Sequence, residues 1–120
     1  MSTKALAYSQ VSPEVIEKFS PPDTLVKGNP KQKVHSFYAA NNANFRTGIW
    51  EGEVGAYRLE FPAGKHEFFV LKTGEVKVHS DDGSVVTISE GEACVLPGGF
   101  KGVFEITKYA AKHFVVLEQA

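Results

Sequence analysis

A regular alternation of short apolar segments and turns runs from Gly55 to Ile106 and constrains the fold more than any other feature. The apolar segments cover residues 56–61, 67–71, 75–80, 84–89, 93–97 and 102–106. Residues typical of turns separate them, at 62–64, 72–74, 81–83, 90–91 and 98–99. Many short strands with turn residues about every ten positions are typical of an antiparallel sandwich or barrel. The sequence therefore predicts an all-β fold.

Alternation within single segments supports this interpretation. Tyr57, Leu59 and Phe61 fall on one side of a strand, while Arg58 and Glu60 fall on the other. Asp82-Gly83 lies between two alternating segments and is the strongest hairpin signal in the chain. Further strands are predicted at 34–39, 45–51 and 113–117, with a short edge strand at 24–26.

The N-terminal part lacks this alternation and contains a signal for a helix start. Ser12-Pro13-Glu14 offers a cap, a proline at the first helical position and an acid beside the positive end of the helix dipole. Val15, Ile16 and Phe19 would share one face of the helix, and Pro21-Pro22 would end it. We therefore expect an N-terminal arm with a short helix over 1–23 and a single β domain over 24–120.

Length and charge exclude several classes of protein. A chain of 120 residues predicts one domain, and a net charge of −1 with no basic stripe argues against a nucleic-acid partner. The sequence contains no apolar run long enough to cross a bilayer and no secretory signal, so we expect a cytoplasmic protein without membrane contact. Cys94 is the only cysteine, which excludes an internal disulfide, and its apolar neighbours predict a small buried side chain.

The spacing of residues 67–99 resembles the two motifs of the cupin superfamily. Glu67 is followed after six residues by Gly74, and Gly91 is followed by Pro97, Gly98 and Gly99. The chain more narrowly resembles the cupin-3 family of the DUF861 type, related to one lobe of ureidoglycine aminohydrolase. The matching segments are 25–30, 48–51, 67–68, 82–83 and 97–102.

This resemblance covers about residues 24–118 and implies a double-stranded β-helix, the RmlC-like jelly roll, often paired as a homodimer. Residues 1–30 have no core of their own to join, so we expect them to cover an edge strand of the same or a partner subunit. The resemblance implies little about the reaction, because one fold hosts many unrelated activities.

The metal site of the superfamily is the clearest departure from its pattern. Metal-binding cupins use three histidines and a glutamate, a donor set suited to Fe, Mn, Ni or Zn. The segment 59–63 contains no histidine, and Gly102 stands where the third histidine would be, so of the four ligands only Glu67 is present. We therefore expect no cofactor. The alternative is a transition metal held by Glu67 with His35, His66 or His113.

Glu67 and Lys101 are the candidate catalytic residues. Glu67 is either a general acid or base at the mouth of the barrel, or a structural carboxylate paired with Arg58, Lys101 or Tyr57 or exposed near a strand end. Lys101 lies in a turn-rich segment, where it is either solvated or an anchor for an anion or a carbonyl group.

The candidate binding residues are mostly aromatic. Trp50 and Tyr57 are either core residues or pocket walls with a polar group for a ligand, and Phe69 is expected to line the barrel. His66 and His113 are candidates because histidine titrates near neutral pH, although a structural role is the alternative.

Two functions of different classes follow. One is a cupin that binds a small polar metabolite in the barrel without the usual metal site. The other is a metal-independent, or atypical-metal, isomerase, epimerase, lyase or hydrolase acting on a sugar acid or ureide, with Glu67 as acid/base.

Overall fold

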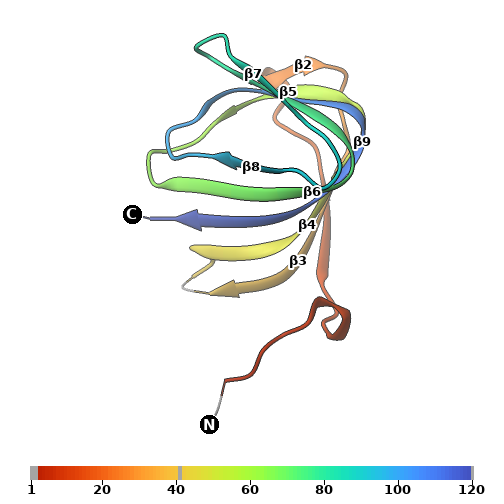
Figure 1. The fold of residues 1–120 in the computed structure, drawn as a ribbon, viewed down its shortest axis with the longest axis vertical. Coiled ribbons are helices and arrows are strands. Elements are labelled where there is room, and N and C mark those ends of the chain that lie inside the picture. Colours follow the sequence, from red (N-terminus) through yellow and green to blue (C-terminus); the bar gives the residue numbers. More distant parts are fainter. Residues whose placement is uncertain (1–2, 41, 120) are drawn as a thin grey trace.

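The structure is a computed structural model that describes residues 3–40 and 42–119. Nine β-strands in this part of the chain form one curled antiparallel sheet (Figure 1). The strands are β1 (Glu14–Lys18), β2 (Leu25–Lys27), β3 (Gln32–Ala40), β4 (Phe45–Gly52), β5 (Gly55–Glu60), β6 (Lys65–Ser80), β7 (Val85–Ile88), β8 (Ala93–Leu96) and β9 (Lys101–Glu118). The predicted all-β fold is confirmed, as a sheet curled into a half-barrel.

Two long strands, β6 and β9, give the sheet its curl. They pair along most of their length, with register shifts between Leu71 and Val76. The C-terminal half of β9 pairs with β4 and its N-terminal half with β5. In the same way β6 pairs with β8 through its first half and with β7 through its second. Each long strand therefore belongs to two differently oriented parts of the sheet.

The turn expected at residues 72–74 is an irregularity within β6 rather than a connection between two strands. Gly74 has φ of +88°, and a Cβ atom there would lie 2.2 Å from the carbonyl oxygen of Tyr109. Only glycine accommodates both the positive φ and the close backbone. A Gly signal inside an alternating pattern therefore marks a bulge here, and the strands predicted at 67–71 and 75–80 are one strand.

The predicted N-terminal helix is wrong. Residues 14–18 form β1, which pairs with β3 from Glu14↔Ser36 to Lys18↔Gln32. The only helical segments in the described part are the 3₁₀ turns η1 (Tyr8–Gln10) and η2 (Pro22–Thr24). Val15 and Ile16 are β-branched, which favours an extended backbone, and the edge of β3 offers backbone hydrogen-bond partners.

Two shorter predictions are confirmed. The edge strand expected at 24–26 is β2, which pairs with β5. Asp82-Gly83 forms the tight hairpin between β6 and β7, with Gly83 at a φ of +92°.

Cys94 is half-buried against the edge of the core, and not fully buried as expected. Within the described residues, no helix has the length and apolar character needed to cross a membrane.

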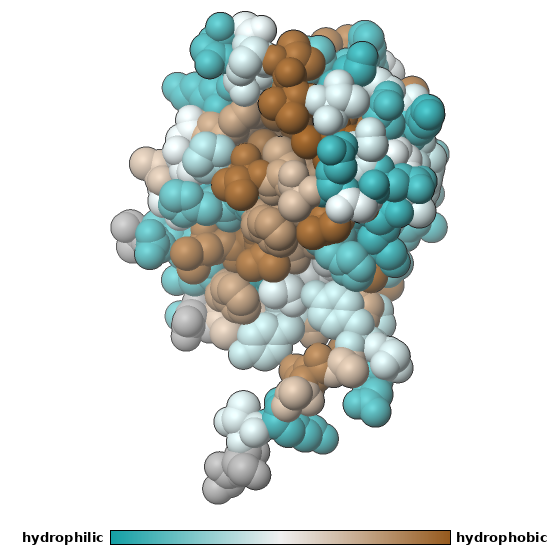
Figure 2. All heavy atoms as spheres, viewed as in Figure 1, coloured by the Kyte–Doolittle hydropathy of each residue, from teal (hydrophilic) through white to brown (hydrophobic). Residues whose placement is uncertain are grey.

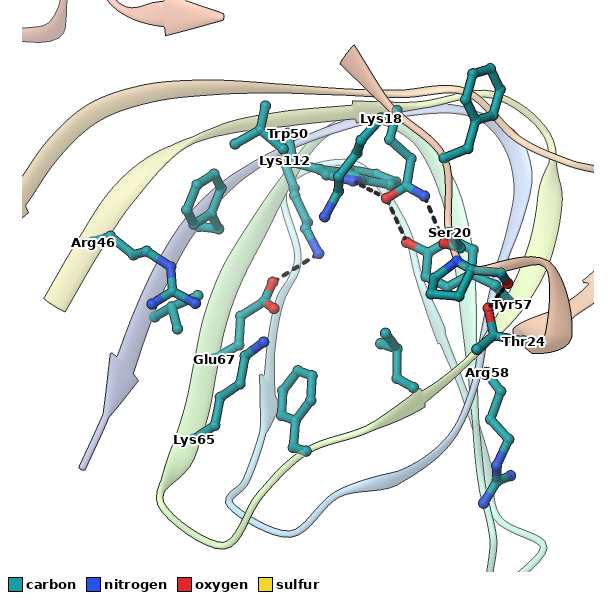
Figure 3. A pocket seen from close by; sticks show the side chains of 18 residues that line it. Lys18, Ser20, Thr24, Arg46, Trp50, Tyr57, Arg58, Lys65, Glu67 and Lys112 are labelled. Atoms are coloured by element: carbon teal, nitrogen blue, oxygen red, sulfur yellow. Dashed lines mark hydrogen bonds and ion pairs between the residues drawn. The ribbon is translucent and has the colours of Figure 1, made fainter. Parts of the chain in front are cut away.

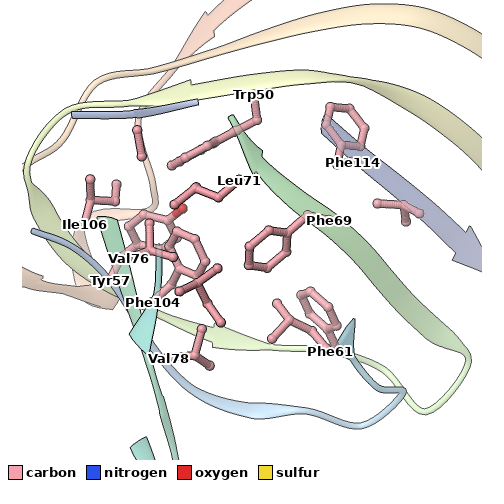
Figure 4. Close-up of a cluster of buried hydrophobic side chains, with 14 residues drawn as sticks. Trp50, Tyr57, Phe61, Phe69, Leu71, Val76, Val78, Phe104, Ile106 and Phe114 are labelled. Atoms are coloured by element: carbon pink, nitrogen blue, oxygen red, sulfur yellow. The ribbon is translucent and has the colours of Figure 1, made fainter. Parts of the chain in front are cut away.

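The hydrophobic core fills one end of the half-barrel (Figure 4). Phe104 lies at its centre, with the rings of Trp50 and Phe69 approaching edge-on at centroid distances of 5.6 and 6.1 Å. Leu71, Val76 and Ile106 are at most 1% exposed and close this end. The other end, near the first residues of β6, remains open and holds the site described below.

The outer face of the sheet carries a second apolar surface, which is exposed. Val95, Phe68 and Val115 are neighbours across β8, β6 and β9, and Phe68 and Val95 are 43% and 60% exposed. Figure 2 shows hydrophobic residues gathered in a band over these strands. We call this surface the outer patch and define it by Phe68, Val70, Val95, Val115 and Leu117.

Candidate functional site

An open cavity of about 300 Å³ lies on the inner side of the sheet. Its walls come from β3, β4, β5, β6 and β9, together with Lys18 at the end of β1 and the segment 19–24 that follows it. The cavity combines aromatic and aliphatic side chains with an unusual number of charged groups. The charged residues that line it are Lys18, Arg46, Arg58, Lys65, Glu67 and Lys112.

Glu67 and Lys112 form an ion pair in the wall of this cavity (Figure 3). Lys112 Nζ lies 2.8 Å from Glu67 Oε2, and the two side chains are only 8% and 11% exposed. The same ammonium group lies 4.5–4.7 Å from the ring centroids of Trp50, Phe69 and Phe104. One carboxylate and three aromatic faces therefore stabilise a lysine that would otherwise be costly to bury.

Gln32 organises the neighbouring wall through three hydrogen bonds. Its Oε1 accepts hydrogen bonds from Trp50 Nε1, at 3.0 Å, and from the Tyr57 hydroxyl, at 3.3 Å. Its Nε2 donates to Ser20 Oγ at 2.9 Å. Burial, followed by the charge of Glu67, raises the pKa of Tyr57 well above its ordinary value. Tyr57 is therefore a neutral hydrogen-bonding group, and the network ties the segment after β1 to the barrel.

The remaining charges of the cavity are all positive, but they are not equivalent. Arg46 binds Glu118 at 2.7 Å, and Arg58 binds Asp81 at 2.6 Å. In the described part of the chain no carboxylate lies within ion-pair distance of Lys18 or Lys65. Partial burial, then the charges of Lys65 and Lys112, lower the pKa of Lys18. The cavity therefore holds uncompensated positive charge.

Four of the seven predicted site residues gather around this cavity. Glu67, Trp50 and Tyr57 line it directly. Phe69 is fully buried in the core behind it and contacts the ammonium group of Lys112. The partner of Glu67 is Lys112, and not Arg58, Lys101 or Tyr57 as the sequence suggested.

The other three predicted residues lie elsewhere. Lys101 is exposed at the start of β9 and is not among the residues that line the cavity. His66 Nδ1 accepts a hydrogen bond from the Gly98 amide at 2.9 Å, which holds the turn after β8. His113 is exposed on the outer face beside Tyr8, and partial burial, then the charge of Lys72, lower its pKa.

Sequence reasoning missed Lys112, Lys18 and Lys65. Lys112 fell between two predicted strands, at 102–106 and 113–117, that are in fact both parts of β9. Its position two residues before Phe114 and four before Val116 places it on the inner face, and this period of two was the available signal. Lys18 was missed because residues 14–18 were interpreted as a helix.

These residues do not fit the metal site of the superfamily. No cluster of three or more histidine, cysteine, aspartate or glutamate side chains occurs among residues 3–40 and 42–119. The groups around Glu67 are ammonium groups, which repel cations. His35 binds Glu51 at 2.6 Å on the outer side, and His66 and His113 also lie away from the cavity.

The curled sheet with an open end is the architecture of a cupin. A model of the EutQ-like cupin domain matches residues 39–114, which is well over half of the chain. The protein therefore belongs to the EutQ-like cupin family. A search of curated proteins found no match.

Solved structures with the same fold support this assignment. A protein of unknown function of the DUF861 family from Pseudomonas syringae is 20% identical, with a TM-score of 0.71 over 88% of this chain and 43% of that chain. The Clostridium difficile EutQ protein is 22% identical, with a TM-score of 0.65 over 84% of this chain and 80% of that one. A DUF861 protein from Thermotoga maritima is 26% identical, with a TM-score of 0.51 over 55% and 73%.

The chain thus spans less than half of the Pseudomonas syringae protein. At these identities the likeness to the first two structures concerns the fold. The relation to a lobe of ureidoglycine aminohydrolase stays a prediction.

Proposed function

We propose that this cupin binds a small polar metabolite at the open end of its barrel, without the usual histidine-rich metal site. The observation that supports this most is the Glu67–Lys112 pair in the wall of an accessible cavity. A buried ion pair is a poor device for stability, because well-packed apolar residues often do as well or better. Charged groups placed beside an open cavity instead suit the recognition of a polar ligand.

The size of the cavity limits the ligand. A volume of about 300 Å³ is at the lower end of the range for small-molecule sites. Trp50 and Tyr57 offer aromatic surface, with their polar atoms already occupied by Gln32. A metabolite of a few carbon atoms with several polar groups fits this combination better than a large cofactor.

The experiment is a thermal-shift screen with a panel of neutral, cationic and anionic metabolites. The wild type is compared with a double variant, Glu67→Gln with Lys112→Met, which removes both charges and leaves no buried charge unpaired. We expect some members of the panel to stabilise the wild type more than the double variant. Equal stabilisation of both proteins by every active compound would contradict a site at this pair.

Enzymatic proton transfer is the second candidate. The observation that favours it is a carboxylate held by an ammonium group and facing a cavity, beside the neutral hydroxyl of Tyr57. In an isomerase or epimerase, Glu67 would take a proton from one carbon of the substrate and return a proton to the same or a neighbouring carbon. A ligand that is turned over by the wild type, and is bound but not turned over by Glu67→Gln, would establish this role.

We further propose that two copies of the chain pair through the outer patch. Three strands bring five uncharged apolar side chains together, of which three are exposed (Phe68, Val95 and Leu117) and two are half-buried (Val70 and Val115). Large exposed apolar surfaces mark interaction sites, and in a two-fold dimer the same surface of each copy contacts the other. Size-exclusion chromatography with light scattering should give a dimer mass for the wild type and a monomer mass for Phe68→Lys. A wild-type monomer at micromolar concentration would contradict the proposal.

A further inference from the structure

The cavity has two cationic side chains that the Glu67–Lys112 pair does not explain. Lys18 comes from the last position of β1, and Lys65 from the first position of β6. In Figure 3 they approach the ion pair from either side. Strands far apart in the sequence thus bring two ammonium groups to one opening.

The Glu67–Lys112 pair does not neutralise the charges of Lys18 and Lys65. Glu67 and Lys112 neutralise each other at 2.8 Å, and Arg46 and Arg58 bind carboxylates outside the cavity. Among residues 3–40 and 42–119, no carboxylate lies within ion-pair distance of Lys18 or Lys65, and Lys65 instead lies 4.5 Å from the ring centroid of Phe61. The cavity therefore carries a surplus of two positive charges.

Like charges that line one cavity repel each other. The charges of Lys65 and Lys112 contribute, after partial burial, to the lowered pKa of Lys18. An anion between these groups would remove the repulsion and gain charge-assisted hydrogen bonds. Lysine also retains three donors, so each of the two ammonium groups can bind a separate anionic oxygen.

Apolar side chains also line the cavity. Leu59, Phe61, Phe114 and Val116 contribute hydrocarbon surface between the charged positions. A bare inorganic ion would leave this surface in contact with water. A short carbon chain carrying its charges toward the two lysines would cover it.

We propose that the cavity selects a small organic dianion, of the size of a four-carbon dicarboxylate, through Lys18 and Lys65. This inference rests on the proposed binding function and names its ligand class. It also gives the N-terminal strand a role, because β1 brings one of the two recognition groups to the site. The Gln32–Ser20 hydrogen bond holds the segment that directly follows Lys18.

The experiment is calorimetric titration of the full chain with succinate, inorganic phosphate and neutral succinamide. We expect succinate to bind more tightly than phosphate and succinamide not to bind. Lys18→Met and Lys65→Met should each weaken succinate binding by roughly tenfold or more, the loss of one charged hydrogen bond. Lys108→Met, which removes an equal charge at an exposed position outside the cavity, should bind as the wild type does.

Methionine keeps most of the side chain, and thermal unfolding of each variant shows whether it is folded. Succinate binding unchanged in both cavity variants would overturn the inference, because the anion would then bind elsewhere. Tighter binding of phosphate than of succinate would overturn the claim that the ligand is organic. Absence of succinate binding would overturn the whole inference. If neutral members of the metabolite panel bind while succinate does not, the inference fails but the proposed binding function stands.

Discussion

At the open end of the barrel, the two faces of the curled sheet differ in the reverse of the usual sense. On the inner face, the open end holds a buried ion pair and two further lysines. On the outer face, the neighbouring positions of the same strands are apolar and exposed, as at Phe68 and Val95. A half-buried antiparallel sheet normally shows apolar residues inside and polar residues outside.

The difference teaches that the two faces call for different explanations. We attribute the charges inside to the proposed ligand, and the apolar residues outside to the proposed pairing of two copies of the chain. Only the closed end, around Phe104, follows the ordinary pattern of a hydrophobic core. Stability should therefore depend mainly on the closed end, while binding should depend on the open end and the outer face.

The largest difference between the two faces should appear when two adjacent phenylalanines, which lie on opposite faces of the sheet, are each replaced by alanine. Phe69 is fully buried and Phe68 is 43% exposed. We expect Phe69→Ala to lower the free energy of unfolding by about 3–5 kcal/mol, since it leaves a cavity in the core. Phe68→Ala should lower it by less than about 1 kcal/mol. Chemical denaturation at low protein concentration measures both, and similar losses would show that the two faces are not distinct.

The next largest effect on stability should come from breaking the Glu67–Lys112 ion pair. Lys112→Met leaves Glu67 buried without its partner, which we expect to cost about 3 kcal/mol of unfolding free energy near neutral pH. Adding Glu67→Gln should recover most of the lost unfolding free energy, because no buried charge remains. If the single and double variants are equally destabilised, the pair contributes through packing alone.

A smaller effect concerns the pH dependence of succinate binding. Lys18 must be protonated to bind an anion, and partial burial followed by neighbouring charges lowers its pKa. The charged groups around it are Lys65, Lys112, Glu67 and Arg46. Affinity should therefore be highest below the lowered pKa of Lys18 and fall by roughly tenfold as pH rises through it. Titrations of the wild type and Lys18→Met across alkaline pH test this, since the variant should lose this step.

The smallest effect should come from a surface carboxylate. Hydrogen bonds from Lys27 and then His79 hold the pKa of Glu105 below its usual range. Its contribution to stability is therefore present above the ordinary carboxyl pKa and lost as pH falls through the lowered one. Melting temperatures of the wild type and Glu105→Gln should differ slightly near neutral pH and converge in strong acid. A difference that persists in acid would contradict this origin.

Much of the fold could be predicted because turn residues and alternation are local signals. Asp82-Gly83 and the segment from Tyr57 to Phe61 are examples, since each side chain acts on its own backbone or strand face. The N-terminal helix failed because β3 provides backbone partners that no local pattern reveals. Gly74 was misassigned because a bulge and a turn need the same conformation.

The site was only partly predictable for a related reason. Glu67 belongs to a recognisable sequence motif, and Trp50 and Tyr57 were candidates because of their residue types. Lys18, Lys65 and Lys112 belong to the site because β1, β6 and β9 bring them to one cavity. The alternation of β9 places Lys112 on the inner face, but no local pattern shows that the three lysines meet. Lys101 was a reasonable candidate beside a motif, but the start of β9 leaves it exposed.

The indole proton of Trp50 offers the most direct test of the binding account. Trp50 is the only tryptophan of the chain, it lines the cavity, and its Nε1 donates to Gln32 beside the ammonium group of Lys112. In ¹H–¹⁵N spectra we predict that succinate shifts this single indole resonance in a saturable way. The shift should disappear when Lys18→Met and Lys65→Met are combined. An indole resonance that does not respond to succinate, or responds equally in the double variant, would contradict an anion site in this cavity.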